Sequence, residues 1–352
     1  MTAPKVTMKD VAALAGVSKS AVSLAFNDSR KLSPATLQNI LNAASELGYS
    51  QDPAARMLRT RRTDSLALLL PQQLDNVLQN PYYTQFLQGI GQTCHREGFT
   101  LLLAPPLRGS MLRAIPYAAV DGFIVSGLEY DRGEVTALRQ RRIPFVLVDS
   151  EWHDDIPSVE IDDGQGTAEV VDYLIGLGHR RIAFVAFDTG AAGGFTDWHG
   201  PVRRRMDGVR HSLAQVGLST DDPDITVLEV PCTRAGGTEA FRRLWSLPER
   251  PTAIVAFSDI IAFGVLDAAR AAGVDVPGSL SVTGFDDLAE ASWTAPSLTT
   301  VRQPIATKGR LAAEYLVEAI ARDQPAEVRH QRLPTSLLIR RSTGPASPAL
   351  AS

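Results

Sequence analysis

The chain has 352 residues, of which 44% are apolar and 21% charged, and a net charge of −4. This length allows two or three domains and a large buried core. Its two cysteines, Cys94 and Cys232, form no CxxC pair and have no zinc-type histidine spacing, so a disulfide framework and a structural metal site are both disfavoured. No apolar run approaches the roughly 20 residues of a membrane span, and the polar residues 1–10 do not look like a signal peptide. We expect a cytoplasmic protein without membrane contact.

The net charge conceals an asymmetry along the chain. Residues 1–63 contain nine Lys or Arg against four Asp or Glu, so this segment carries +5 and the remainder carries −9. A basic segment on an acidic body is expected when the segment meets a polyanion and the body does not. The negative total therefore does not exclude a nucleic-acid binder.

Two short amphipathic helices are predicted near the N-terminus. Thr7 and Asp10 form a plausible N-cap arrangement for the first helix, which runs to Ala15 with apolar residues at helical spacing. Gly16 can adopt the left-handed conformation that ends this helix, and Ser18 can cap the second helix. The two helices are thus separated by only three residues.

A third helix is predicted from Ser33-Pro34 to Gly48, which completes a small all-α domain. A helix, a tight turn containing glycine and a second helix with small or polar outer residues are typical of the helix-turn-helix that reads DNA. The small Ala12 and Gly16 fit this motif because bulky side chains would prevent a close crossing. The alternative, a helical hairpin that merely packs on the body, is disfavoured by the basic charge.

From residue 66 onward the pattern changes to short apolar runs that alternate with amphipathic helices. Continuous apolarity predicts strands buried on both faces, as in parallel sheets. Nine such strands are more than one doubly wound sheet usually contains. We therefore predict two α/β lobes, each with a doubly wound parallel sheet. The predicted strands are 66–70, 100–104, 122–126, 145–149, 158–162, 181–187, 225–230, 253–258 and 280–286.

Motifs of common enzymes are missing from the sequence. It contains no GxxxxGK[ST] phosphate loop, no HExxH, no GxSxG nucleophile elbow and no GxGxxG that opens a helix after a strand. The six histidines are scattered, and His179, in "LGHRRI", is interpreted as a structural hydrogen-bonding residue. We expect neither an enzyme nor a cofactor.

Several longer motifs together resemble the lactose repressor (lacI) family of bacterial transcription regulators. They include "VTMKDVAALAGVSKSAVSLAFN", "LGYSQDPAARMLRTRRT", "NPYYTQFLQGI", "VDGFIVSG" and "SVTGFDDLAEASWTAPSLTTVRQP". The resemblance implies a homodimer that binds a two-fold symmetric double-stranded DNA operator. It also implies a two-lobed body, similar to periplasmic sugar-binding proteins, with three crossings between the lobes and a small-molecule effector in the cleft.

This resemblance gives the expected domain organisation. Residues 1–50 are the helix-turn-helix domain, residues 51–63 are a hinge helix with a linker, and residues 64–340 are the two-lobed domain for effector binding and dimerisation. Residues 341–352, which are rich in Gly, Pro and Ser, are expected to be disordered.

The resemblance also implies DNA contacts. Thr7 and Ser18 lie near phosphates, and Leu24 stands where relatives often have an arginine that contacts guanine, so their operator sequence does not carry over. Leu58 matches the leucine that wedges into the minor groove, with Arg56 and Arg59 beside the phosphates. The alternative for residues 52–63 is a solvated basic linker, which has no need of a leucine. The residues implied for the major groove are Lys19, Ser20, Ala21 and Ser23.

The effector site implied by the resemblance combines stacking faces with fixed charges. Arg205 supplies the cation, and Arg203 is the competing candidate. Cys232 and Ser258 depart from the usual pattern, which has an effector-stacking aromatic residue and an asparagine there. Phe195 or Trp198 is a candidate replacement for the missing face. The remaining implied effector residues are the aromatic Tyr82 and Tyr83 and the acceptors Asp162, Asp259 and Asp286.

Taken together, these observations favour a transcription regulator, most simply a repressor, whose operator affinity responds to a metabolite such as a sugar. The main alternative is a solute-binding protein of a transport system, which shares the two-lobed body but needs a signal peptide and no basic head. A sugar-modifying enzyme with a DNA-binding head is a third, weaker hypothesis. The sequence leaves open the effector, the operator, the direction of the response and the choice between dimer and tetramer.

Overall fold

The computed structural model describes residues 6–27, 29–50, 57, 60, 62–128, 133–150, 153–188, 198–321 and 328–347. The chain forms two compact units, Met1–Thr63 and Asp64–Ser352. Each unit is described by itself below.

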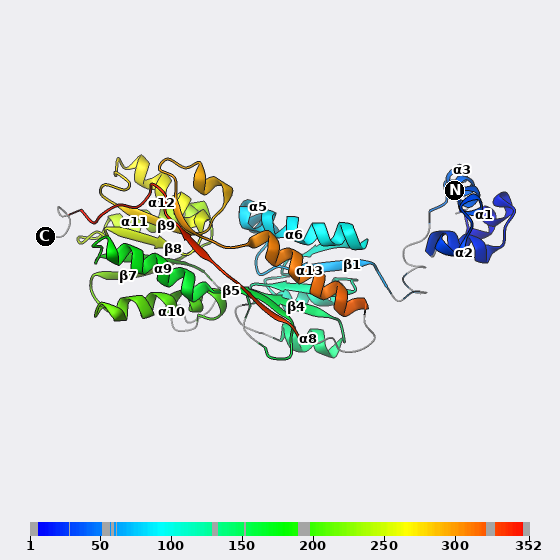
Figure 1. Ribbon diagram of the computed structural model, residues 1–352, viewed down its shortest axis with the longest axis horizontal. Coiled ribbons are helices and arrows are strands. Elements are labelled where there is room, and N and C mark those ends of the chain that lie inside the picture. The colour runs from blue at the N-terminus through cyan, green and yellow to red at the C-terminus, as the bar shows by residue number, and fades with distance from the viewer. Residues whose placement is uncertain are drawn as a thin grey trace. The chain divides into compact units, whose positions relative to one another are not determined.

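The N-terminal unit is a small helical domain, drawn in blue in Figure 1. The Thr7 amide and hydroxyl both donate to Asp10 Oδ2 at 2.8 Å, and the Ser18 hydroxyl accepts from the Ala21 amide at 3.1 Å. Both predicted caps are therefore present. The elements are α1 (Met8–Ala15), α2 (Lys19–Asn27), the 3₁₀ turn η1 (Ser29–Lys31) and α3 (Pro34–Glu46).

Three fully buried aliphatic side chains, Val11, Val22 and Ile40, form the centre of this unit. Ala12 is also buried there, as its small size suggested. Gly16 ends α1 in the left-handed conformation that the sequence predicted, but it does not provide the close helix crossing that was also expected. An added Cβ at Gly16 would meet nothing within 4 Å, so its φ of 66° rather than close packing requires glycine.

The second unit contains two lobes. The sheet of the first, here called the N-lobe, has the strand order β11-β5-β4-β3-β1-β2, and every neighbouring pair is parallel. The strands are β1 (Ser65–Leu69), β2 (Thr100–Ala104), β3 (Gly122–Ser126), β4 (Phe145–Val148), β5 (Ser158–Ile161) and β11 (His330–Leu333). The N-lobe helices are α5 (Leu74–Gln79), α6 (Pro81–Glu97), α7 (Met111–Ala114), the 3₁₀ turn η2 (Ile115–Tyr117), α8 (Glu134–Gln140) and α13 (Ile305–Ala321).

The other sheet, in the C-lobe, has the order β12-β10-β9-β8-β6-β7 and is parallel except for β12. Its strands are β6 (Ile182–Phe187), β7 (Ile225–Val230), β8 (Ala253–Ala256), β9 (Ser281–Asp286), β10 (Thr299–Arg302) and β12 (Ser336–Leu338). The helices are α9 (Asp163–Gly176), α10 (Gly200–Gln215), α11 (Arg234–Trp245), α12 (Asp259–Ala271) and the 3₁₀ turn η4 (Ala289–Ser292).

All nine predicted strands are present, with ends that differ by at most two residues. The expectation of burial on both faces fails for β2 and β7, which are partly exposed because they lie at sheet edges. The sequence pattern missed β10, β11 and β12. These segments are short and contain polar residues, and β11 and β12 are edge strands.

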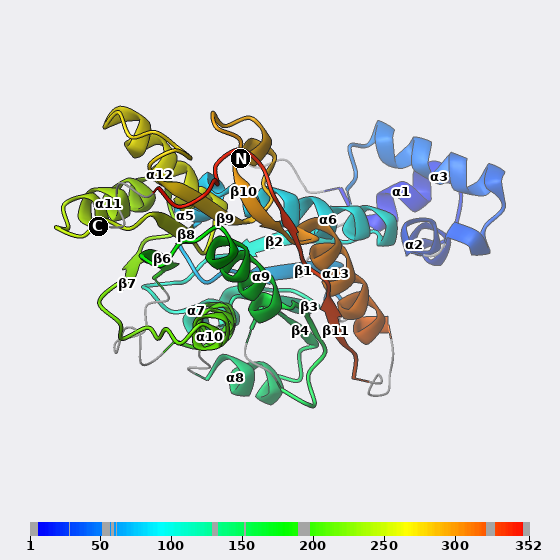
Figure 2. The same ribbon diagram turned by 60° about the vertical axis from the view of Figure 1, so that its left-hand side comes forward.

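Three segments connect the lobes. One joins β5 to α9 at Asp162, the second joins β10 to α13 through Gln303-Pro304, and the third joins β11 to β12 through Pro334-Thr335. Figure 1 shows the third as the red segment that passes from one lobe to the other. The paired helices α6 and α13 cover one face of the N-lobe sheet, as Figures 1 and 2 show.

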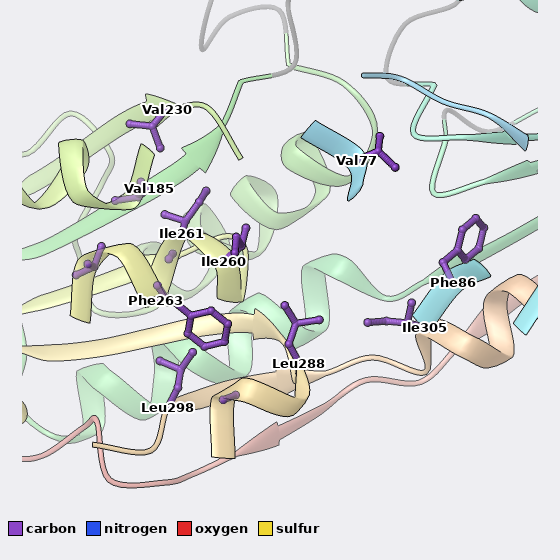
Figure 3. Close-up of a cluster of buried hydrophobic side chains, with 14 of the residues drawn as sticks. Val77, Phe86, Val185, Val230, Ile260, Ile261, Phe263, Leu288, Leu298 and Ile305 are labelled. Atoms are coloured by element: carbon purple, nitrogen blue, oxygen red, sulfur yellow. The ribbon is translucent and has the colours of Figure 1, made fainter. Parts of the chain in front are cut away.

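One hydrophobic cluster extends from the N-lobe into the C-lobe. Figure 3 shows Phe86 of α6 beside Ile305 of α13, and Leu288, Phe263 and Leu298 on the C-lobe side. All five side chains are at most 2% exposed. The connections between the lobes are therefore anchored in a common apolar core.

The C-terminal segment differs from the expectation of disorder over residues 341–352. Ser342 is fully buried, where it accepts from the Thr299 amide at 2.8 Å and donates to the Val282 carbonyl at 2.6 Å. His179 contacts Thr252 Oγ1 and the Gly344 carbonyl at 2.8 and 3.0 Å, which fits its predicted structural role. Residues 341–347 are therefore attached to the C-lobe, and 348–352 lie outside the described residues.

The contact between α11 and α12 depends on two glycines. A Cβ added to Gly264 would lie 1.9 Å from the Arg234 carbonyl oxygen, and one added to Gly237 would lie 1.9 Å from that of Ile261. Backbone atoms cannot move aside as the end of a flexible side chain can. Both positions therefore exclude any larger residue.

We predict that Gly264→Ala lowers the free energy of unfolding by about 1–3 kcal/mol, because the methyl group forces the two helices apart. The matched control is Gly91→Ala in α6, where an added Cβ meets nothing within 4 Å. This control is expected to raise stability by about 0.4–1 kcal/mol. Urea unfolding of both variants measures the difference, and equal effects would contradict the close helix contact.

Candidate DNA-binding face and interlobe cleft

The helix α2 has an inner and an outer side. Val22 and Ala25 are buried, whereas the predicted DNA-contacting residues are fully or partly accessible. The outer side presents polar residues together with the apolar Leu24, as a major-groove helix can, while Ala21 also packs against the domain core. The exposed predicted residues are Thr7, Ser18, Lys19 and Ser20, and the partly exposed ones are Ala21, Ser23 and Leu24.

The predicted hinge contacts Arg56, Leu58 and Arg59 lie outside the described residues. Their assignment to the minor groove therefore remains a prediction.

A cleft of about 1180 Å³ separates the two lobes. Its walls come from the segments at the carboxyl ends of the parallel strands, which is the usual ligand position in open α/β sheets. Among the described N-lobe residues, Pro71, Ser126 and Asp149 follow or end β1, β3 and β4. The corresponding C-lobe residues are Phe187, Cys232, Ser258 and Asp286, at or after the ends of β6, β7, β8 and β9.

Arg205 is the cation of the C-lobe wall. Its Nε donates to Asp163 Oδ1 at 2.9 Å, its Nη1 donates to the Phe257 carbonyl, and its guanidinium lies 3.6 Å from the centre of the Phe285 ring. Burial alone would lower the pKa of Arg205, but the nearby Asp163 and Asp286 carboxylates raise it. The guanidinium is thus permanently charged and rigidly held.

The competing candidate Arg203 lies elsewhere. Its side chain is 56% exposed and pairs at 3.8 Å with Asp207 on the same helix. The structure therefore selects Arg205 over Arg203 as a cleft residue. The intervening Arg204 links the lobes, because it pairs with Asp163 and also donates to the Ser150 carbonyl of the N-lobe at 3.3 Å.

Asp286 is fixed at the end of β9 by two neighbours. Ser258 Oγ donates to its Oδ2 at 2.9 Å, and Gln303 Nε2 donates to its Oδ1 at 2.5 Å. Burial raises the pKa of Asp286 above its ordinary value, although Arg205 and these hydrogen bonds oppose the rise. Its φ of 135° is uncommon outside glycine, and such strained positions are often part of functional sites.

On the N-lobe wall the polar centre is Asp149, which the sequence analysis did not select. Tyr82 donates its hydroxyl to Asp149 Oδ2 at 2.8 Å, and the fully buried Lys308 donates its ammonium to the same oxygen. Asp149 also has a positive φ, of 48°. An acidic residue directly after a buried parallel strand was the available signal, whereas nothing marked Lys308 as a partner of the cleft.

Tyr82 and Tyr83 both line the cleft, as the resemblance implied. Their rings meet edge to face at 5.3 Å, and Tyr82 also stacks on Phe86 at 6.2 Å. Burial, together with the Asp149 carboxylate, raises the pKa of the Tyr82 hydroxyl well above its ordinary value, so that it remains a hydrogen-bond donor at neutral pH.

Two predicted effector residues lie outside the lining of the cleft. Asp162 occupies the first crossing segment, where its Oδ1 caps α9 by accepting from the Gln165 amide at 3.0 Å. Asp259 is fully buried and accepts from the Leu288 amide at 2.8 Å and the Thr300 hydroxyl at 2.5 Å. Both carboxylates are therefore used to hold the protein's own segments.

Relatives usually have an effector-stacking aromatic residue where this chain has Cys232. Among the described aromatic residues of the C-lobe, Phe187 lines the cleft at the end of β6 and can supply such a ring face. The proposed replacement Trp198 is 5% exposed and belongs to the C-lobe core, and Phe195 lies outside the described residues. Cys232 and Ser258 both line the cleft. Asn80 Nδ2 approaches Cys232 Sγ at 3.8 Å from the opposite lobe.

Comparison with known proteins agrees with this architecture. Residues 7–52 match the sequence family described as bacterial regulatory proteins, lacI family. Residues 171–343 match the family described as periplasmic binding protein-like domain. The transcriptional regulator CelR of Thermobifida fusca is 32% identical over 343 residues, which cover 96% of this chain and 98% of that protein. The chain belongs to the lacI family. The ribose operon repressor of Escherichia coli K12 is 31% identical over 93% of this chain and 97% of its own length.

Solved structures of lacI-family proteins extend the comparison to the fold. A complex of CelR with cellobiose has a TM-score of 0.69 and 30% identity, and it covers 96% of this chain and 100% of that one. The lac repressor dimer bound to its operator has a TM-score of 0.81 at 23% identity, with 97% and 100% coverage, and supports the fold alone.

Other site types find no support in the part of the chain that the structure describes. There, His, Cys, Asp and Glu form no cluster able to hold a metal ion. Likewise, no described helix is both long and apolar enough to span a bilayer.

We predict that Cys232 is unreactive although it lines the cleft. Burial, with a smaller contribution from Asp286, raises the pKa of its thiol to about 12. At pH 8 we expect iodoacetamide to alkylate Cys232 roughly 10³-fold more slowly than an unperturbed thiol, because the thiolate is the nucleophile. In the variant Cys94→Ala, Cys232 is the one remaining thiol. Mass spectrometry then measures its rate of alkylation in the native and in the urea-unfolded protein. Equal rates in the two states would contradict the proposed environment.

Proposed function

We propose that this lacI-family protein is a sequence-specific transcription repressor whose operator affinity is changed by a sugar bound between the lobes. It binds a two-fold symmetric operator as a homodimer and acts in the cytoplasm. The observation that carries this proposal is the presence, in one chain, of a basic helix-turn-helix unit and a polar interlobe cleft at the strand ends.

The DNA-binding unit supports the first half of the proposal. Residues 1–63 carry +5, and α2 has a polar outer side beside a buried apolar side. Lys19, Ser20 and Ser23 suit contacts to base edges and phosphates, and Leu24 suits an apolar contact such as a thymine methyl group. Two hinge segments, each with Leu58 as the minor-groove wedge and Arg56 and Arg59 beside the phosphates, complete the interface.

The cleft supports the second half. Tyr82, Tyr83 and Phe187 give it apolar ring faces, and Arg205 and Asp286 give it fixed polar groups. Sugars present apolar ring faces and many hydroxyl donors and acceptors, which such a lining matches. The names of similar proteins point the same way, since the solved structure of CelR contains cellobiose and a solved regulator from Enterococcus faecium contains ribose.

The alternative functions fit less well. A solute-binding protein of a transport system shares the two lobes but has no use for a basic helix-turn-helix unit. For an enzyme, the cleft needs an activated nucleophile or a general acid–base pair. Its thiol, Cys232, is kept protonated, and three of its four described carboxylates, Asp149, Asp286 and Glu134, have protein partners. We therefore propose a binding role without turnover.

We predict that the full chain selects a two-fold symmetric sequence from a random DNA pool. Its affinity for this sequence should fall steeply with salt, with a log–log slope of about −5 to −10, from roughly 0.9 per neutralised phosphate. Fluorescence anisotropy of the selected duplex at several salt concentrations measures the slope. A slope near zero, or no enriched sequence, would refute operator binding.

A further inference from the structure

Behind the N-lobe wall of the cleft, in contact with Asp149, lies a buried lysine that the proposed function does not yet explain. Lys308, on α13, is 0% exposed, and its ammonium contacts Asp149 Oδ2 and, at 2.6 Å, Gln303 Oε1. It also lies 5.1 Å from the centre of the Tyr82 ring. An ammonium group is seldom fully buried unless it is paired, because removing it from water is costly.

These contacts continue across the lobe boundary. Gln303, in the second crossing segment, accepts from Lys308 through Oε1 and donates to Asp286 through Nε2 at 2.5 Å. Ser258 then donates to the other oxygen of Asp286. A single buried cation therefore fixes Asp149 on one wall directly and Asp286 on the other wall through one amide.

We propose that Lys308 is a positioning residue of the effector site, which holds Asp149 and, through Gln303, Asp286 as paired acceptors for an uncharged, hydroxyl-rich ligand. This inference rests on the proposed function, because it concerns the ligand of the same cleft. Asp149 lines the cleft, and its buried Oδ1 has no hydrogen-bond partner among the described residues, which leaves one acceptor atom for a ligand group to satisfy. Lys308 itself touches no ligand in this arrangement.

The charges of the cleft favour the same class of ligand. The described lining of the cleft carries one guanidinium, from Arg205, one imidazole, from His199, and four carboxylates, from Glu134, Asp149, Asp188 and Asp286. Arg205 is already matched by Asp163, and Asp149 by Lys308. The one guanidinium of this lining is therefore already neutralised, and the carboxylates outnumber it four to one, which disfavours a phosphate or carboxylate and supplies acceptors for hydroxyl groups.

Electrostatics gives the role of Lys308 a pH signature. Burial opposes ionisation of Asp149, but Lys308, with smaller contributions from Tyr82 of α6 and Arg204 of α10, lowers the pKa of Asp149 below its ordinary value. The neighbouring Arg205 and Asp286 complete the charged surroundings. In the wild type this pairing stabilises the fold above the unfolded pKa of Asp149 and is lost only as the pH falls through the lower folded value.

Lys308→Met reverses the direction of the pKa shift of Asp149, because burial without the lysine raises this pKa above its ordinary value. The variant should melt on the order of 5–10 °C below the wild type at pH 8, and the gap should shrink toward pH 5 as Asp149 takes up a proton. Adding Asp149→Asn should remove the pH dependence of the gap. Arg310→Met, which deletes a 37% exposed cation from the same helix, is the matched control and should show little change.

Ligand binding to the same full-length variants, measured by calorimetry with cellobiose, D-ribose and D-ribose 5-phosphate, completes the test. We expect the wild type and Arg310→Met to bind an uncharged sugar and not the sugar phosphate. Lys308→Met should bind the uncharged sugar at least about tenfold more weakly than the wild type. The proposal would be overturned if the difference in melting temperature between the wild type and Lys308→Met did not change with pH. It would also be overturned if Lys308→Met bound the sugar as tightly as the wild type, or if the wild type preferred the sugar phosphate. A wild type that binds neither sugar would contradict the sugar response, and the pH profile would still decide the role of Lys308.

Discussion

The pairing of buried charges at the junction of the lobes is the constraint on which this structure depends. Arg205 with Asp163, and Lys308 with Asp149, place four ionised groups where little water reaches them. Loss of one member of such a pair leaves a buried charge without compensation, which typically costs about 3–5 kcal/mol. The pairs therefore hold the cleft walls in place, and they determine which acceptors remain for a ligand.

The fold explains why these groups meet. In each lobe the parallel strands bring their carboxyl ends to one edge, and the three crossing segments turn the two edges toward a common cleft. Gln303 lies on one of these crossings, so the segment that joins the lobes also carries a hydrogen bond between their polar centres. A ligand that binds both walls can favour one arrangement of the lobes, which is the basis of an allosteric response.

Local pattern was enough to predict most elements and the two lobes, because strand runs and helix caps are encoded by neighbouring residues, whereas the cleft was expected only from the family resemblance. It missed β10–β12, which contain polar residues and are recognised only once they pair. Asp259 and Asp162 were assigned by resemblance as ligand acceptors, yet their side chains bond to the protein's own backbone. Lys308 was invisible in the sequence because its partner Asp149 lies 159 residues away.

A sugar that binds both walls of the cleft, with Arg205 in one of them, should be coupled to the operator, and linkage makes this coupling testable in both directions. If a sugar changes operator affinity, the operator must change sugar affinity by the same factor, at least about 5-fold for ordinary allosteric coupling. We therefore propose to measure sugar affinity by calorimetry with and without operator DNA, in wild type, Arg205→Met and the exposed control Arg203→Met. We expect this coupling to give equal reciprocal factors in wild type and Arg203→Met and to be lost in Arg205→Met. Identical sugar affinity with and without operator in the wild type would contradict it.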